Sequence, residues 1–137
     1  HWMVHSFPTR RSSDLERILA AANSLWLNLL HLHGDDVMFD LAGDYASRRR
    51  LAILNWHDRE TPPSLHDALP RFPGALLGGL HRTDTMLRGT PRDVRKAVRE
   101  AVEMTNGRRL IVGTGCVLWI PTPVGNIRAA REAVDSL

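Results

Sequence analysis

The sequence predicts an α/β fold in which about four parallel strands alternate with helices. Short apolar runs, bounded by glycine or polar residues, recur along the chain, and each is followed by a stretch with the helical spacing of apolar residues. Repeated strand–helix units require right-handed crossovers and therefore a parallel sheet. With 137 residues, 43% of them hydrophobic and 24% charged, the chain has the length and composition of one globular domain and not of a disordered segment.

The first predicted elements are a helix, a strand and a second helix. Residues 16–25 are rich in alanine and leucine, which favours a helix, and residues 26–32 form an apolar run that reads as a strand. Asp35 or Asp36 can cap the next helix, which we expect to continue through Tyr45. On one side of that helix lie Val37, Met38, Leu41 and Ala42.

The middle of the chain predicts two more strands with a helix between them. Residues 51–56 are an apolar run that ends at His57, Asp58 and Arg59. We expect a helix over residues 63–71 and a third strand over residues 75–80. The glycines of that third strand indicate that the backbone comes close to a neighbour or a ligand there.

The last part of the chain predicts a capped helix, a fourth strand and a final helix. Thr90 is a suitable N-cap, followed by Pro91 at the first helical position and Asp93 at the third. Asn106 and Gly107 end that helix. The fourth strand covers residues 109–112, and the final helix opens at Thr122-Pro123. We expect its inward face to consist of Val124, Ile127, Ala130 and Val134.

Two segments match the translation of a common sequencing adapter. Residues 7–15 read Phe-Pro-Thr-Arg-Arg-Ser-Ser-Asp-Leu, which is one reading frame of that adapter, so we expect residues 1–15 to lie outside the native domain of residues 16–137. The alternative is a genuine polar arm. Residues 64–70 match a second frame, and this segment is either a true helix or a graft that replaced one.

Composition excludes several classes of function. The net charge is only +3 and the arginines are scattered apart from residues 48–50, so no nucleic-acid groove is predicted. A single cysteine rules out an internal disulfide framework and fits a reducing compartment. Apolar runs are too short to span a membrane and no signal peptide is evident, so we expect a cytoplasmic protein without a membrane partner.

The strongest candidate site joins His31, His33 and Cys116. Side chains two apart on a strand point to the same face, so both imidazoles can reach one ion or one substrate, and Cys116 follows the fourth strand. The alternative is that this loose spacing is incidental. At the tip of the second strand, His57 and Asp58 form either an acid–base couple or a structural hydrogen-bond pair. Arg82 either contacts an anionic substrate or is solvated.

The motifs, in their order along the chain, resemble the C-terminal half of the uroporphyrinogen decarboxylase superfamily. They are His31 to Asp40, Asn55 to Thr61, Gly78-Gly79-Leu80, Gly89-Thr90-Pro91, Gly113 to Cys116, Thr122-Pro123 and Asn126-Ile127-Arg128. The resemblance covers nearly everything after Glu16. It implies the last four strands of a (β/α)8 barrel, a fold that carries its catalytic groups at the carboxyl ends of the strands. The unpaired edges of such a half-barrel predict self-association.

The resemblance implies two chemistries. In the methyltransferase branch, a His-x-Cys and a later cysteine bind zinc, which activates a small-molecule thiol toward a corrinoid or similar methyl donor, carried in some members by a corrinoid protein. By position the ligands are His31, His33 and Cys116, with histidine replacing the first cysteine. The alternative is uroporphyrinogen decarboxylation, which needs no metal. Its Gly-His-Gly motif is replaced here by Gly113-Thr114-Gly115. A third expectation is an inactive, truncated fragment.

Overall fold

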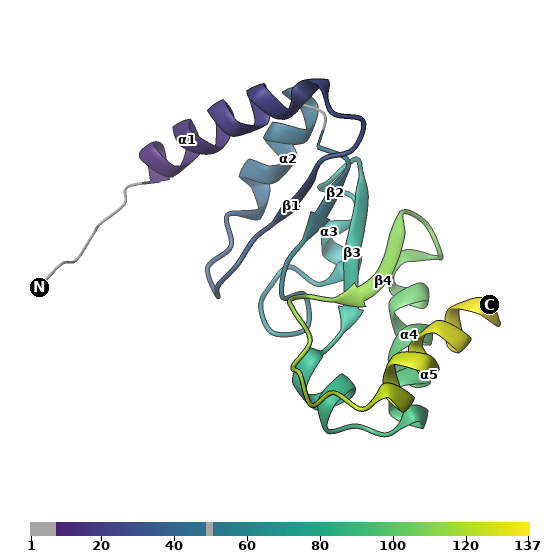
Figure 1. Ribbon diagram of the computed structural model, residues 1–137. Helices are drawn as coiled ribbons and strands as arrows, with labels where there is room; N and C mark the ends of the chain where they lie inside the picture. Colours follow the sequence, from purple (N-terminus) through teal and green to yellow (C-terminus); the bar gives the residue numbers. More distant parts are fainter. Residues whose placement is uncertain (1–7, 49–50) are drawn as a thin grey trace, which may run out of the picture.

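The computed structural model describes residues 8–48 and 51–137 (Figure 1). Its strands are β1 (Leu29–His31), β2 (Ile53–Asn55), β3 (Ala75–Leu80) and β4 (Leu110–Thr114). Its helices are α1 (Pro8–Ala21), α2 (Phe39–Arg48), α3 (Leu65–Ala68), α4 (Pro91–Thr105) and α5 (Val124–Asp135). Two short helical segments complete the chain, the 3-10 turn η1 (Ala22–Ser24) and the π-helical turn η2 (Arg82–Leu87).

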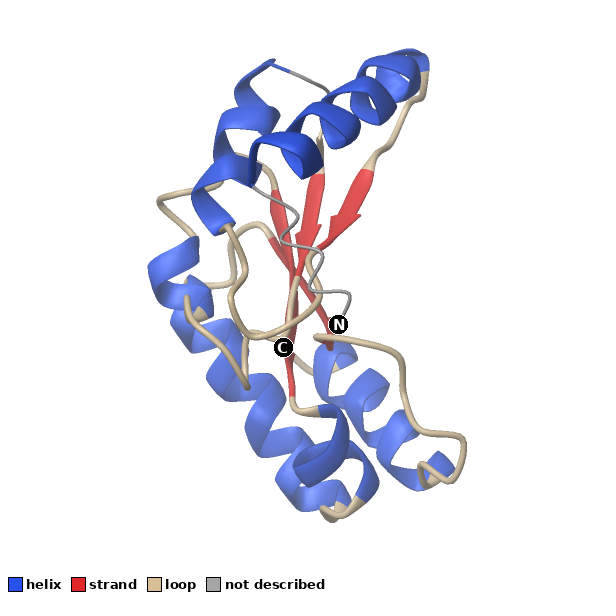
Figure 2. Ribbon diagram, turned by 90° about the vertical axis from the view of Figure 1, so that its left-hand side faces the viewer, coloured by secondary structure: helices blue, strands red, loops and turns tan. Residues whose placement is uncertain are grey.

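The four strands form one parallel sheet in the order β1-β2-β3-β4. Figure 2 shows the strands side by side, with the helices packed along the sheet. A sheet in which sequence order equals spatial order, with every crossover of the same hand, carries its crossover helices on one face, as in a sector of a barrel. The predicted fold class, four parallel strands alternating with helices in a partial barrel, is confirmed.

The two faces of the sheet differ in burial. Leu54 and Leu76 are neighbours in register and are fully buried beneath the helices, in a core cluster with Trp56 and Phe72. The next row points the other way, and there Leu29 is 50% exposed. This open face corresponds to the interior of a closed barrel. His31 and Asn55 lie in a register row of the same open face, at the carboxyl ends of their strands.

Helix α4 has the caps that its sequence predicts. The Thr90 hydroxyl accepts from the backbone N–H of Asp93, and the Asp93 carboxylate accepts from the backbone N–H of Thr90, which completes a capping box. At the other end Asn106 adopts a left-handed conformation with φ 51°, followed by Gly107 at φ 64°. Val94 and Val98 on the buried face pack fully into a second core cluster.

Several boundaries differ from the sequence prediction. Helix α1 covers Pro8–Ala21 instead of residues 16–25, and β1 is limited to Leu29–His31. Helix α2 begins only at Phe39, so neither Asp35 nor Asp36 is its cap. Apolar residues continue past the point where a strand stops pairing, which is why an apolar run overestimates its length. The helix after β2 is shorter than the expected range of residues 63–71, because α3 covers only Leu65–Ala68.

The predicted inward face of α5 is wrong for Val124, Ile127 and Val134, whereas Ala130 is partly buried against the second core cluster. Val124 and Ile127 are 60% and 44% exposed, and the buried side chains are Asn126, Ala129 and Ala133. Helix α5 packs against α4 and η2, where small residues allow close approach and Asn126 donates to the backbone carbonyls of Met86 and Gly89. The larger apolar side chains of Val124 and Ile127 therefore face away from the described part of the domain.

The two adapter-like segments differ in how they join the fold. Residues 1–7 lie outside the described residues, and residues 8–15 belong to α1, whose main contact is with η1. Leu19 is the buried side chain among those described in α1. In the second segment Leu65 and Ala68 are fully buried in the core. That residues 1–15 lie outside the native domain stays a prediction. Among the described helices, none combines the length and apolarity needed to cross a membrane.

Candidate metal centre

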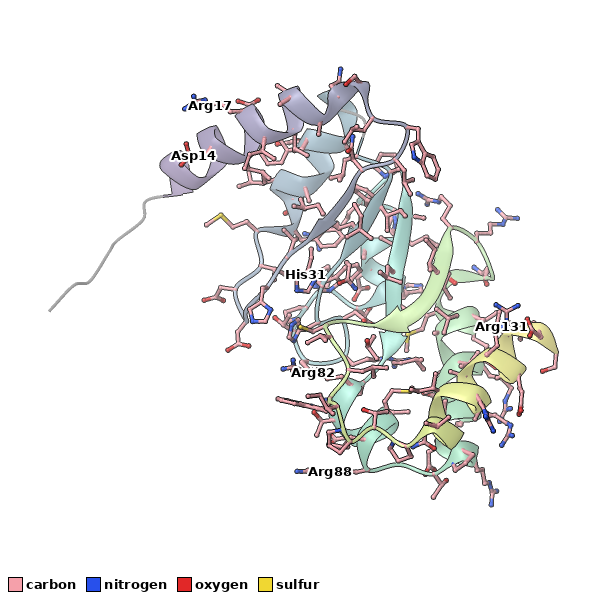
Figure 3. The ribbon with its side chains drawn as sticks, viewed as in Figure 1. Asp14, Arg17, His31, Arg82, Arg88 and Arg131 are labelled. Carbon is pink, nitrogen blue, oxygen red and sulfur yellow. The ribbon has the colours of Figure 1, made fainter. Side chains whose placement is uncertain are left out.

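Strand β1 presents the first two candidate ligands at its carboxyl end. His31 is its last residue, and His33 follows two positions later, so both imidazoles reach the same side. The Nε2 atom of His31 lies 3.4 Å from the Nδ1 atom of His33. Figure 3 shows His31 at the lower end of the strands in that view. The predicted convergence of the two histidines is therefore present.

Asn55 at the end of β2 determines which nitrogen of His31 faces the cluster. Its Nδ2 group donates to the carbonyls of Leu77, at 2.8 Å, and Thr114, at 3.2 Å, which fixes the orientation of the buried amide. The Oδ1 atom, as an acceptor, then lies 2.6 Å from Nδ1 of His31. His31 must donate through Nδ1, so its Nε2 carries a lone pair.

His57 follows β2 and enters the same cluster from the neighbouring strand. Its Nδ1 atom lies 3.3 Å from a carboxylate oxygen of Glu60, and its Nε2 atom lies 3.3 Å from Nδ1 of His33. Because a carboxylate accepts, Nδ1 is the donor and the Nε2 lone pair points to the cluster. A histidine held through its second nitrogen by a carboxylate or amide oxygen is the usual support for a metal ligand.

The surroundings of Glu60 keep its carboxyl group ionised. Burial raises the pKa of this carboxyl, but the hydrogen bond from His57 and the nearby positive charge of Arg82 act in the opposite direction, and the pKa lies below its ordinary value. Glu60 is therefore an ionised acceptor near neutral pH. An ionised acceptor strengthens the hydrogen bond from His57 and makes the opposite ring nitrogen a better donor to a cation.

Cys116 reaches the histidines because the chain crosses from β4 toward β2 directly after the strand. Gly115 permits this approach: a Cβ atom there would lie 2.5 Å from the carbonyl oxygen of Trp56 and 2.6 Å from Cα of His57. The Thr114 hydroxyl donates to the carbonyl of Cys116. The Sγ atom of Cys116 then lies 3.9 Å from Nδ1 of His33.

Together, His31, His33, His57 and Cys116 place one ligand atom each within 4.8 Å of one another. A tetrahedral ion with bonds of about 2.0–2.3 Å separates its ligand atoms by roughly 3.3–3.8 Å. The three contacts to Nδ1 of His33, at 3.3, 3.4 and 3.9 Å, are close to these values. The Nε2 lone pairs of His31 and His57 both point into the cluster, and they repel each other unless a cation or a proton lies between them. The nitrogen and sulfur donor set suits zinc.

An open pocket of about 500 Å³ adjoins the cluster on the uncovered face of the sheet. It is lined by His31, Asn55, Leu77, Thr114, Cys116 and Val117. Two candidate ligands and the residue that orients one of them thus form part of its wall. A small molecule in this pocket would meet the donor atoms of the cluster directly.

Asp58 lies apart from the cluster, although the sequence paired it with His57. Its carboxylate accepts from the backbone N–H of Gly79 at 3.0 and 3.2 Å. Burial raises the pKa of Asp58 to about 6, against the opposing effects of the Gly79 hydrogen bond and the Arg59 charge. Gly78 makes room for it, because a Cβ there would lie 2.5 Å from an Asp58 oxygen. Neither Asp58 nor His57 has the other as a hydrogen-bond partner, so the predicted hydrogen-bond pair is wrong. A catalytic role for His57 and Asp58 stays a prediction.

Arg82 is connected to the cluster through Glu60. Its Nε atom lies 3.5 Å from Glu60 Oε1, and its guanidinium stacks 5.2 Å from the ring centre of Trp119. Nε is buried without a hydrogen-bond partner among the described residues. Figure 3 shows Arg82 below His31, close to the same end of the sheet. Its predicted role in binding an anionic substrate is compatible with this place and stays a prediction.

Sequence reasoning missed Asn55 and Glu60, and it gave His57 a catalytic role instead of a place among the donors. The available signal was the spacing Asn55-x-His57-x-x-Glu60 at the tip of β2. Polar residues at that tip face the same strand end as His31, because β1 and β2 are parallel neighbours. The sequence placed Cys116 with the histidines, but it could not show that the segment after β4 would lie against the tip of β2, where Gly115 meets Trp56 and His57.

Comparisons with known proteins identify the family of the chain and a solved structure of similar fold. The sequence profile of the family described as uroporphyrinogen decarboxylase (URO-D) matches residues 30–137. A solved structure of a methyltransferase from Methanosarcina mazei is similar, with a TM-score of 0.74 and 22% sequence identity. The match covers 91% of this chain and 35% of that chain, so the chain spans about a third of the solved protein. No curated protein matches the chain.

Proposed function

Because the chain belongs to the uroporphyrinogen decarboxylase family, we propose that its histidine and cysteine cluster holds a zinc ion and serves methyl transfer to a small-molecule thiol. The observation that carries the proposal is the convergence of four nitrogen and sulfur donors, two of them with their second nitrogen held by an oxygen acceptor. The methyltransferase fold of the similar structure supports the same class of reaction.

His31, His33, His57 and Cys116 would hold the ion, with Asn55 and Glu60 fixing two of the rings. When bound, zinc supplies a positive charge that lowers the pKa of a coordinated thiol, so that a thiolate persists at neutral pH. A catalytic zinc has three protein donors and one exchangeable position, and it can expand to five ligands. A substrate thiol would therefore replace one of these four donors or bind as a fifth ligand. The pocket beside His31 and Cys116 gives that thiol a route to the cluster.

In the reaction, the thiol gives up its proton to water in the open pocket, and its sulfur forms a bond to the methyl carbon of the donor. The bond between that carbon and the donor breaks, and its electron pair stays with the donor. Arg82 lies near enough to the cluster, through Glu60, to hold an anionic group of the substrate. The family resemblance suggests a corrinoid as the methyl donor, delivered free or by a corrinoid protein.

Metal content tests the first part of the proposal. We expect about one zinc per chain in dialysed protein by elemental analysis, and loss of that zinc in Cys116→Ser and His31→Ala. His66→Ala is the matched control, because His66 is exposed and its contact is with neighbouring Asp67. Unchanged zinc in both site variants would end the methyltransferase interpretation and return the decarboxylase as the better assignment.

Thiol methylation tests the second part. Zinc-loaded protein is incubated with methylcobalamin and 2-mercaptoethanol, and the methyl thioether is measured by mass spectrometry. We expect product above the protein-free rate, and a loss of product in Cys116→Ser but not in His66→Ala. Zinc binding without any thioether would keep the metal site and refute methyl transfer by this chain.

A further inference from the structure

Only the residues before Cys116 in the sequence fix it directly to the sheet. Before it, Gly115 is wedged against the tip of β2, and after it no helix or strand begins until α5 at Val124. Within that connecting segment Val117 is 76% exposed and Ile120 is completely exposed. Leu118 is partly buried against the second core cluster. The position of the sulfur therefore depends on how the segment is fixed beyond Cys116.

Trp119 provides that fixing, three residues after the cysteine. Its indole Nε1–H donates to the hydroxyl of Thr83 at 3.0 Å, and the guanidinium of Arg82 lies over its ring. Both partners belong to the first turn of η2, which directly follows β3. That turn is itself anchored, because Nδ1 of His81 accepts from the backbone N–H groups of Thr83 and Asp84. The connection therefore runs from this hydrogen-bonded turn to the loop that carries Cys116.

Arg82 joins this anchor to the opposite side of the cluster. Besides covering Trp119, it faces Glu60, whose other oxygen holds His57. One guanidinium thus contacts the loop of the cysteine and the carboxylate that orients a histidine. A cation over an indole ring is favoured by the ring quadrupole, and a partly desolvated pair gains more than an exposed one.

We infer that Trp119, with Thr83 as its acceptor, is a positioning residue that makes Cys116 a ligand of the metal. The inference rests on the proposed metal site and goes beyond it, since it states what decides whether sulfur joins the nitrogen donors. Without the indole–hydroxyl bond, the exposed segment around Val117 and Ile120 can move, and the Sγ atom moves with it. The histidines are held separately, through Asn55 and Glu60, and keep their places.

Cobalt(II) is the probe, because a thiolate bound to cobalt gives a charge-transfer absorption that nitrogen ligands do not give. Trp119→Phe keeps a ring under Arg82 but removes the indole N–H, and Thr83→Val removes the acceptor at nearly the same volume. We expect each variant to bind cobalt about 10-fold more weakly, as for other changes to groups that support ligands, and to lose charge-transfer intensity per bound ion. The double variant should be no worse than either single variant, because both remove the same bond.

Ile120→Ala is the matched control, since it changes a completely exposed side chain of the same segment. It should bind cobalt as the unchanged protein does. Urea unfolding of each metal-free variant separates positioning from general stability, because a merely structural loss moves the unfolding midpoint without changing the absorption per bound cobalt.

Three results would overturn the inference. If both single variants keep full affinity and intensity, Trp119 does not position the sulfur. If the unchanged protein binds cobalt without a charge-transfer band, Cys116 is not a ligand, and a histidine site remains. If the unchanged protein binds no cobalt at all, the proposed function fails together with this inference.

Discussion

Asn55 Oδ1 lies 2.6 Å from His31 Nδ1, and this contact directs the Nε2 lone pair of His31 into the donor cluster. The same amide donates to carbonyls of β3 and of the end of β4. One buried side chain thus connects all four strands and orients a ligand. Replacing Asn55 therefore tests two effects, the orientation of His31 and the hydrogen bonding between the strands.

The variant Asn55→Leu should lower zinc affinity by about 10-fold, because His31 loses the group that orients its ring. It should also lower the free energy of unfolding by about 2 kcal/mol, since the carbonyls of Leu77 and Thr114 lose a donor. Asn55→Asp keeps an acceptor for His31 but cannot donate, so it should lose stability and retain more of the zinc affinity. Calorimetric titration and urea unfolding measure the two effects, and equal zinc affinity in all three proteins would contradict this role.

Gly115→Ala should weaken zinc binding. The added Cβ would lie 2.5 Å from the carbonyl oxygen of Trp56 and 2.6 Å from Cα of His57, so backbone must shift and move Cys116. Gly125→Ala is the control, because a Cβ there meets nothing within 4 Å and alanine suits a helix better. Zinc retention in dialysed samples compares them, and equal retention would show that Gly115 is not needed for the site.

The capping box of α4 predicts a specific acid dependence of stability. Hydrogen bonds from the Thr90 side chain and backbone lower the pKa of Asp93 below its usual 3.8. The ionised form is therefore favoured in the folded state, and its contribution is fully present above pH 3.8 and is lost as the pH falls through the lowered pKa. Asp93→Asn should be less stable than the unchanged protein at pH 6, and the difference should shrink at pH 3. A constant difference across this range in urea unfolding would refute the ionised cap.

Thr90→Ala tests the hydroxyl of the same cap. Because the first turn of α4 loses a side-chain acceptor for one of its backbone N–H groups, we expect the free energy of unfolding to fall by about 1 kcal/mol. Thr90→Ser restores the acceptor and should recover most of the loss. No difference between the alanine and serine variants in thermal unfolding would count against the cap.

Residues 1–15 should be dispensable for stability. Their deletion removes the first part of α1, whose main contact is with η1, so we expect a change in unfolding free energy within about 0.5 kcal/mol. Leu19→Asp is the contrasting variant. Because it places a charge at a buried position, it should lower the free energy of unfolding clearly more than the deletion does. A large loss on deletion, measured by urea unfolding, would show that the adapter-like segment is part of the folding unit.

The edges of the sheet should make the protein associate. Among the described strands, β1 and β4 are edge strands, and a groove of about 620 Å³ beside β4 is lined mainly by apolar side chains. Ile111, 40% exposed, and Val134, 39% exposed, are two of them. Ile111→Lys should shift sedimentation toward the monomer, because edge charges oppose strand pairing, whereas Arg92→Glu on α4 should not. Purely monomeric behaviour of the unchanged chain at high concentration would refute association.

The sequence by itself determined the order of the elements, the parallel sheet and the family. These follow from local signals: apolar runs, the Thr90 and Asp93 cap, and the His31-x-His33 spacing at a strand end. It also placed Cys116 with the histidines through the family resemblance. Each of these depends on neighbours in sequence or on motifs with fixed spacing, which is why they could be predicted.

Only the tertiary structure decided which side chains complete the site and which face of α5 is buried. His57, Asn55 and Glu60 join the cluster because β1 and β2 lie side by side and the segment after β4 crosses toward them, which is a contact between residues far apart in the chain. On α5, close packing against α4 selects the small residues Ala129 and Ala133 over the larger Ile127, although both stripes have helical spacing. Periodicity marks the apolar faces of a helix, but the shape of the opposing surface determines which of them is buried.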